Sequence, residues 1–211
     1  MELVHAARNG DRQAFGRLVD LYQRPVFSLA YRMLGNAADA EDAAQEAFLR
    51  AFRSLGGYDA SRAFSTWILS IAAHYCIDRI RRRRMTEVSL DAVAPPRWQA
   101  SPLADPETRA DRAAEAERVR AGLAALPEEY RVVVILRYWH DMGYCEIAAI
   151  LGESESAVKS RLHRARRRLA EYLPARDVSG DGRAGEGQAL GSGTKRAPEE
   201  RNPCSATAPA N

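Results

Sequence analysis

Apolar residues recur every three or four positions over most of the chain as far as residue 173, which is the spacing of amphipathic α-helices. The first predicted helix covers residues 15 to 35, with Pro25 as a candidate kink. A second covers residues 39 to 55 and stops at a pair of glycines, and a third begins at residue 64 and runs into a series of arginines. The pattern therefore predicts three packed helices in the N-terminal part.

The periodicity disappears over residues 86–109, where prolines recur, and returns at about residue 110. Further helices are expected up to Pro127, which is placed in the first turn of the next helix, and then over residues 144–151 and 155–173. The segment 174–211 is rich in glycine and proline and has few large apolar side chains. We therefore predict an all-α protein with a disordered tail over 174–211.

The predicted domains are two small helical units, 1–85 and 110–173, joined by a flexible linker over 86–109. The chain has 211 residues, which is enough for two small cores. No charge-free run is long enough to cross a bilayer, and the charged N-terminus does not resemble a signal peptide. A cytoplasmic protein without membrane insertion is expected.

Candidate catalytic chemistry is scarce. The three cysteines contain no CxxC pair, so the sequence predicts neither a disulfide framework nor a zinc site, and no metal or cofactor is expected. The four histidines are isolated, and no phosphate-binding glycine loop or nucleophile motif occurs. We predict that the chain is not an enzyme.

The formal net charge of +3 is small, but the basic residues are concentrated in two segments. Residues 79–84 include five arginines, and residues 156–168 are basic without one acidic residue. Both segments end predicted helices. Basic helix faces of this kind are candidates for nucleic-acid contacts.

The segment 144–163 fits a helix-turn-helix. Small Ala148 stands where two helices would touch, Gly152 stands at the turn, and apolar residues recur at the inward positions. The second helix of the motif would then present its basic side chains to a DNA major groove. An ordinary helical hairpin with a solvated basic face is the alternative, which the coincidence of small, glycine and basic positions disfavours.

Four stretches together resemble an extracytoplasmic-function sigma factor of bacterial RNA polymerase, over residues 11–173. They are DAEDAAQEAFLRAF from Asp39, FSTWILSIAAHYCIDRIRRRR from Phe64, LPEEYRVVVIL from Leu126 and YCEIAAILGESESAVKSRLHRARRRL from Tyr144. The resemblance implies that the first domain is sigma region 2 and the second is sigma region 4. It also implies promoter-specific initiation of transcription.

The resemblance implies that the second helix binds core RNA polymerase, at a basic coiled coil of the largest subunit, while region 4 contacts the polymerase flap. The implied polymerase-binding residues are Asp39, Asp42, Gln45 and Glu46. An acidic face beside an apolar seam suits a complementary partner. From the sequence alone, a solvated face of a core helix is the preferred explanation of these residues, and only the resemblance to the family reverses that order.

Region 2 is implied to melt the promoter's −10 element and to capture a flipped base with the loop 58–63. Capturing a single strand needs aromatic surfaces for bases and cations for the backbone. The candidates are Tyr58, Arg62, Phe64, Trp67, Arg79, Arg81, Arg82 and Arg83. Because Phe64 and Trp67 have core spacing with the following isoleucines, Tyr58 and Arg62 are preferred as contacts.

Region 4 is implied to bind the −35 element. The candidates are Lys159, Ser160, Arg161, His163, Arg164 and Arg167. Arg161 and Arg166 are assigned either to phosphates or to internal support. The turn carries Glu153 and Glu155, which repel phosphates, while Ser154 is a candidate cap of the helix that follows.

Two further partners or functions stay open at this point. The family often has an anti-sigma partner, but no residue pattern here identifies one. The alternative function is a stand-alone helix-turn-helix transcription regulator, which would have no need of the stretches at Asp39 and Phe64.

Overall fold

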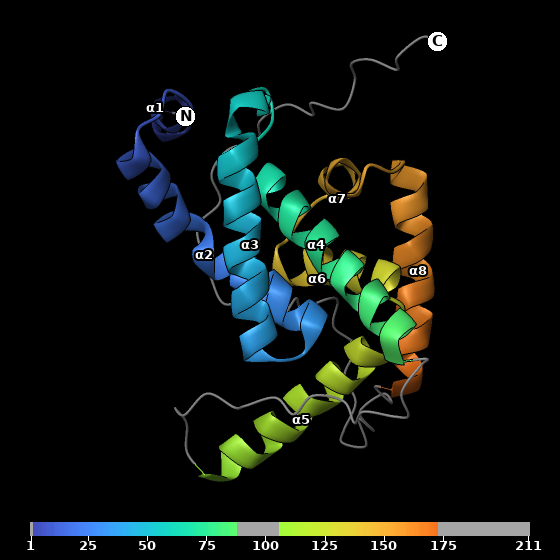
Figure 1. The fold of residues 1–211 in the computed structure, drawn as a ribbon. Coiled ribbons are helices and arrows are strands. Elements are labelled where there is room, and N and C mark those ends of the chain that lie inside the picture. The colour runs from blue at the N-terminus through green and yellow to red at the C-terminus, as the bar shows by residue number, and fades with distance from the viewer. Residues whose placement is uncertain (1, 88–105, 173–211) are drawn as a thin grey trace, which may run out of the picture. The chain divides into compact units, whose positions relative to one another are not determined.

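The computed structural model describes residues 2–87 and 106–172, and all the regular elements within these two ranges are helices (Figure 1). The predicted all-α class is therefore confirmed for this part of the chain. The predicted linker over 86–109 lies mostly outside the described residues, and the predicted tail over 174–211 lies entirely outside them. The described helices belong to one compact unit.

The N-terminal group contains four α-helices and one short 3-10 turn. Their bounds are α1 (Glu2–Arg8), α2 (Arg12–Leu34), α3 (Ala37–Ser54), the turn η1 (Leu55–Gly57) and α4 (Phe64–Glu87). The sequence pattern anticipated α2, α3 and α4 but not α1. That helix is only seven residues long and buries only Val4 and Ala7, so it leaves almost no periodic signal.

Local capping explains where α2 begins and ends. The Asp11 carboxylate accepts hydrogen bonds from the N–H groups of Gln13 and Ala14, at 2.8 and 3.0 Å. Gly35 ends α2 in the left-handed region with φ of 87°, a conformation that a side chain would disfavour. Pro25 lies inside α2, which continues through it.

The C-terminal group contains four α-helices. Their bounds are α5 (Pro106–Ala125), α6 (Glu128–Trp139), α7 (Tyr144–Leu151) and α8 (Glu155–Tyr172). Pro127 occupies the cap position immediately before α6, one residue earlier than predicted, and α5 begins a turn before the predicted residue 110. The predicted bounds of α7 and α8 agree within one residue, whereas α2 and α3 begin three and two residues before their predicted starts.

The two groups of helices share a packed core. Val26, Leu29 and Met33 of α2 are fully buried, as are Ile135 and Leu136 of α6. The contacts between the groups are made by α2 with α5 and α6, and by α4 with α6 and α7. Figure 1 shows α4 in green beside the gold helix α7.

A buried guanidinium fixes α6 against α2. Arg131 donates from Nη1 to the Met33 carbonyl at 2.5 Å, and from Nη2 to the carbonyls of Ala124 and Leu126 at 2.7 and 3.0 Å. On the same seam, the Arg32 guanidinium lies 4.6 Å from the centre of the Trp139 ring. Charged hydrogen bonds to buried carbonyls are among the stronger polar contacts, so they hold this junction in register.

Candidate functional site

The helices α7 and α8 form the predicted helix-turn-helix. Ile147, Val158 and Leu162 are buried between them, and Ala148 lies in the close contact. Gly152 has φ of +67°, which ends α7 and turns the chain toward α8. The Ser154 hydroxyl then accepts a hydrogen bond from the Ala157 N–H at 3.2 Å, so the predicted cap of α8 is confirmed.

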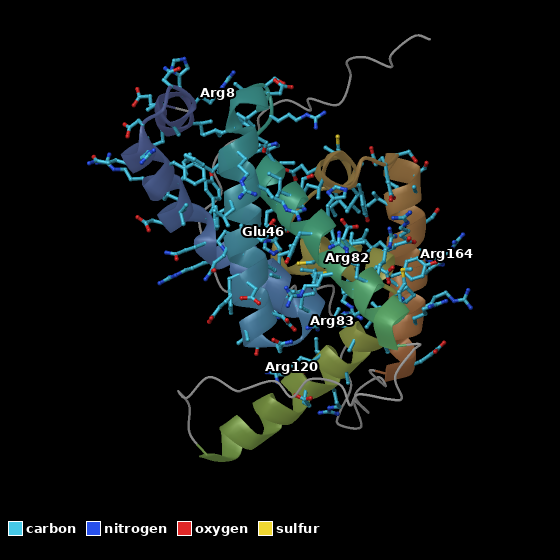
Figure 2. The ribbon with its side chains drawn as sticks, viewed as in Figure 1. Arg8, Glu46, Arg82, Arg83, Arg120 and Arg164 are labelled. Atoms are coloured by element: carbon cyan, nitrogen blue, oxygen red, sulfur yellow. The ribbon has the colours of Figure 1, made fainter. Side chains whose placement is uncertain are left out.

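One face of α8 is buried and the opposite face is exposed and basic. The exposed predicted residues are Lys159, Ser160, His163, Arg164 and Arg167. Arg164 extends from α8 into solvent (Figure 2). This face has the arrangement that a major-groove-binding helix requires, since its side chains follow one another at helical spacing.

The two glutamates of the turn neutralise part of that face. Arg161 is half-buried and its Nη1 lies 2.5 Å from Glu153, while Lys159 Nζ lies 2.6 Å from Glu155. The hydrogen bond to Glu155 raises the pKa of Lys159. Arg161 therefore supports the turn in this conformation, which is one of its two predicted roles, whereas Arg166 is exposed.

The arginines at the end of α4 are held by carboxylates from two different helices. Arg79 and Arg83 both donate to Asp39 of α3. Arg81 lies 3.1 Å from Glu128 and 2.8 Å from Glu129, and Arg84 lies 2.8 Å from Glu128. Arg82 is exposed on the same segment, and Figure 2 labels it with Arg83 on α4. The sequence pattern indicated the basic run but not its acidic partners.

The loop before α4 differs most from its prediction. Tyr58, which was preferred over Phe64 and Trp67 as a DNA contact, has only 3% of its surface exposed. Its ring centre lies 4.9 Å from that of Trp67 and 5.8 Å from that of Phe64, and its hydroxyl donates to the Arg62 carbonyl. An aromatic cluster under the loop therefore buries Tyr58, which disfavours the predicted direct contact of its ring with a base.

The neighbouring candidates in this loop and in the first turn of α4 agree better with their predictions. Phe64 is buried, as its core spacing indicated, and Trp67 is partly buried. Arg62 is exposed. Burial raises the pKa of the Tyr58 hydroxyl, which stays a neutral hydrogen-bond donor to the loop.

The four predicted polymerase-binding residues of α3 do not share one environment. Asp42 and Gln45 are exposed, and Glu46 is partly exposed and pairs with Arg50 at 2.8 Å. Asp39 is buried beneath the arginines of α4. Burial opposes ionisation of Asp39, but hydrogen bonds from Asn36 and Arg83 and the nearby arginine charges outweigh it and lower the pKa.

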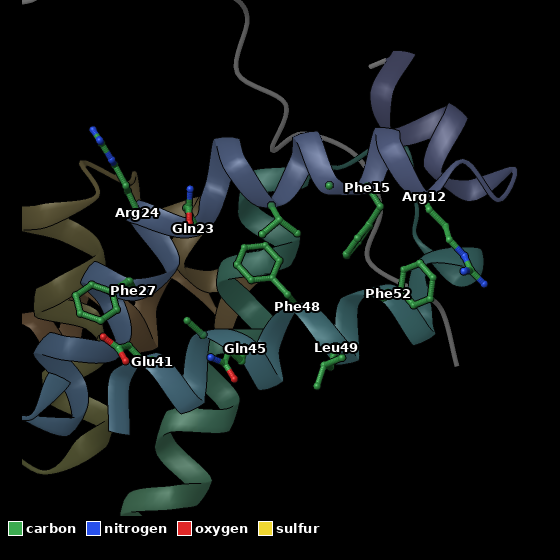
Figure 3. A pocket seen from close by; sticks show the side chains of 13 residues that line it. Arg12, Phe15, Gln23, Arg24, Phe27, Glu41, Gln45, Phe48, Leu49 and Phe52 are labelled. Atoms are coloured by element: carbon green, nitrogen blue, oxygen red, sulfur yellow. The ribbon is translucent and has the colours of Figure 1, made fainter. Parts of the chain in front are cut away.

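An apolar groove beside these residues was not predicted. It lies between α2 and α3 and has a volume of about 890 Å³ (Figure 3). Phe15 and Val19 line it from α2, and Phe48, Leu49 and Phe52 line it from α3. Leu49 and Phe52 are 50% and 48% exposed. The sequence did contain a signal for this groove, since Leu49 and Phe52 form a second apolar stripe on the helix.

Within residues 2–87 and 106–172, no three histidine, cysteine or acidic side chains come together in a way that could hold a metal ion. None of the helices in this part of the chain is long and apolar enough to span a membrane.

Comparison with protein families matches this chain at both groups of helices. The model of sigma-70 region 2 matches residues 18–86, and the model of sigma-70 region 4 matches residues 116–169. The first match contains α3, α4 and most of α2, and the second contains the helix-turn-helix.

Known relatives cover the same part of the chain. The ECF RNA polymerase sigma factor SigW of Bacillus subtilis is 37% identical over 81% of this chain and 94% of its own length. SigM of Mycobacterium tuberculosis, strain H37Rv, another ECF sigma factor, is also 37% identical, over 82% of this chain and 83% of its own. The solved structure of CnrH in complex with the cytosolic domain of CnrY is similar with a TM-score of 0.60 and 28% identity, covering 82% of this chain and 96% of that one. The chain therefore belongs to the extracytoplasmic-function group of the sigma-70 family of RNA polymerase sigma factors.

Proposed function

We propose that this chain docks on core RNA polymerase through α3 and directs it to promoters by reading the −35 element with α8 and the −10 element with α4 and its preceding loop. The observation that carries the proposal is the helix α8. Its inner face closes the core, while its outer face presents basic and polar side chains to solvent. A helix held in this way can enter the major groove without disturbing the fold.

In the −35 role, Lys159, Ser160 and His163 are the candidates for base edges, since they lie in the N-terminal half of α8. Arg164 and Arg167 are the candidates for phosphates or guanine, because guanidinium groups pair well with both. Arg161 supports the turn through Glu153 and becomes a phosphate contact only if that pair opens.

In the −10 role, Arg62 and Arg82 are the first candidates for the single strand because both are exposed. Arg79, Arg81 and Arg83 contribute positive charge beside them, although carboxylates of this chain bind all three. Trp67 can offer its partly exposed ring to a base. Tyr58 and Phe64 hold the loop from below instead of contacting DNA directly.

For polymerase binding, the support comes from the surface of α3. Asp42, Gln45 and Glu46 provide an acidic and polar row, and the exposed apolar residues Leu49 and Phe52 follow it along the helix. A hydrophobic patch with a charged border suits a partner that has a basic border of its own. Asp39 acts from beneath, by fixing α3 against α4.

The test is co-elution of the purified full chain with bacterial core RNA polymerase on a sizing column, followed by run-off transcription from genomic fragments. We expect a stable complex and transcripts that core polymerase alone does not make. Direct binding to duplex DNA without binding to core polymerase would contradict the proposal and would favour a stand-alone regulator.

A further inference from the structure

The first turn of α6 lies against the arginines of α4. The Glu128 carboxylate is placed between two of them, with Oε1 at 3.1 Å from Arg81 Nε and Oε2 at 2.8 Å from Arg84 Nη1. Glu128 is only 7% exposed, and Glu129 adds a second contact to Arg81 at 2.8 Å. A carboxylate of region 4 therefore forms ion pairs with two arginines of region 2.

The environment of Glu128 favours its charged form. Burial opposes ionisation, but a hydrogen bond from its own backbone N–H, the hydrogen bond from Arg81 and the charges of Arg84 and Arg81 outweigh it and lower the pKa. Carboxylates are also favoured in the first turn of a helix by the helix dipole. The contact is therefore fully ionic at neutral pH.

Other contacts extend the same junction along α4. The Ser70 hydroxyl donates to the Ile150 carbonyl of α7 at 3.0 Å, and α4 packs against α7 as well as α6. Arg131, three residues after Glu128, fixes α6 to the Met33 carbonyl of α2. The carboxylates are thus held in place by packing around them and not by the ion pairs alone.

The chemistry of the junction matters for DNA. A single strand binds a basic helix through its phosphates, which use the same guanidinium donors that carboxylates use. Phosphates and Glu128 therefore compete for Arg81 and Arg84. While α6 lies against α4, the two carboxylates compete at a high effective concentration, because they belong to the same molecule as the arginines.

We propose that Glu128 and Glu129 form an intramolecular latch that blocks Arg81 and Arg84 in the free chain, and that this latch opens before α4 binds the single strand. The latch rests on the proposed DNA role of α4. It makes the free chain a weaker binder of nucleic acid than its arginine content suggests, until separation of α6 from α4 releases the arginines.

The experiment uses the full chain and a fluorescein-labelled single strand of random sequence, about 12 nucleotides long, which is within the site size of single-strand binders. Affinity is measured by fluorescence anisotropy, and the radius of gyration by small-angle X-ray scattering. The variants are Glu128→Gln and Glu129→Gln. The matched control is Glu2→Gln, which removes one negative charge from the exposed start of α1.

We expect Glu128→Gln to bind the strand about five- to tenfold more tightly than the wild type, as loss of a partly buried ion pair would allow. Its radius of gyration should increase. The control should change affinity by less than about twofold, since screening limits a remote surface charge. Glu129→Gln should give a smaller gain of the same sign and serves as the second variant if Glu128→Gln does not fold.

Affinity and radius equal to those of the control, in a variant with native helical circular dichroism, would overturn the latch. Expansion without tighter binding would also overturn it, because the carboxylates would then not block the arginines. The proposed DNA role of α4 is tested separately by adding Arg82→Ala, at an exposed position, to Glu128→Gln. If that addition leaves affinity unchanged, α4 does not bind the strand, whatever the scattering shows about opening.

Discussion

Arg83 of α4 donates a hydrogen bond to the carboxylate of Asp39 of α3, a residue 44 positions earlier in the chain. Arg79 donates to the same carboxylate, and the Asn36 side chain, which accepts from the Asp39 N–H at 2.7 Å, donates to it as well. Asp39 therefore joins the start of α3 to the C-terminal part of α4. Its main contribution in this conformation is to fix the angle between two helices that carry different proposed functions.

Replacing Asp39 by Asn should lower the free energy of unfolding by about 1–3 kcal/mol, because the charge-assisted hydrogen bonds are lost and two arginines lose their partner. The matched control is Asp42→Asn, which removes the same charge from an exposed position 3.7 Å from Arg79 and should cost less than about 0.5 kcal/mol. Urea denaturation at pH 7 measures both. Equal effects of the two variants would show that Asp39 does not hold the junction.

The contribution of Asp39 should also depend on pH. Its pKa is lower in the folded chain than in the unfolded one, so its stabilisation is present above the unfolded pKa of about 4 and is lost as pH falls through the lower folded pKa. The stability difference between wild type and Asp39→Asn should therefore be largest near neutral pH and should shrink below about pH 4. If the stability difference between the wild type and Asp39→Asn stayed constant down to pH 3, the pKa of Asp39 would not be lowered by folding.

Tyr58 should behave as a structural residue. Tyr58→Phe removes the hydroxyl that donates to the Arg62 carbonyl and should cost about 1 kcal/mol of stability, with promoter opening retained. Tyr58→Ala also removes the ring from the cluster with Phe64 and Trp67 and should cost about 3–5 kcal/mol. Thermal unfolding together with permanganate footprinting of the promoter separates the two effects. Failure of opening in a fully stable Tyr58→Phe variant would instead support a direct contact of the hydroxyl with DNA.

Polymerase binding should depend on the exposed acids of α3. Reversing Asp42 and Glu46 together to lysine should weaken binding to core polymerase at least about tenfold, because complementary charges steer the partners together and like charges repel. Stability should change little, since both positions are at least partly exposed. Competition against the wild-type chain for core polymerase measures the change, and Glu171→Lys controls for the added positive charge.

The sequence predicted the helices well because their signals are local. Three-and-four spacing and the glycines at 35 and 152 act over a few residues, so α2, α7 and α8 fall within a few positions of their predicted bounds. The inward side of the helix-turn-helix was predicted for the same reason. Val158 and Leu162 stand at core positions of a strongly periodic helix.

The differences arise where a side chain is defined by distant partners. Asp39 has the same local pattern as Asp42, and only the approach of α4 buries one and leaves the other exposed. In the same way, the burial of Tyr58 depends on how the loop folds over Trp67. A periodic pattern contains no information about such contacts, so the sequence predicted the helices but not which of the candidate side chains they bury.

The last prediction concerns the −35 reader. Arg164→Ala should reduce transcription from a promoter that depends on its −35 element by about tenfold, because one phosphate or base contact of Arg is worth roughly 1–3 kcal/mol. Polymerase binding and stability should be unchanged, since Arg164 is exposed.

The matched variant Arg161→Ala breaks the contact with Glu153 and should lower stability as well as transcription. Run-off transcription with the wild-type and a scrambled −35 element distinguishes the roles: Arg164→Ala should lose most of the difference between the two templates. If it keeps that difference while Arg161→Ala abolishes it without loss of stability, the DNA-reading face of α8 would have to be centred on Arg161.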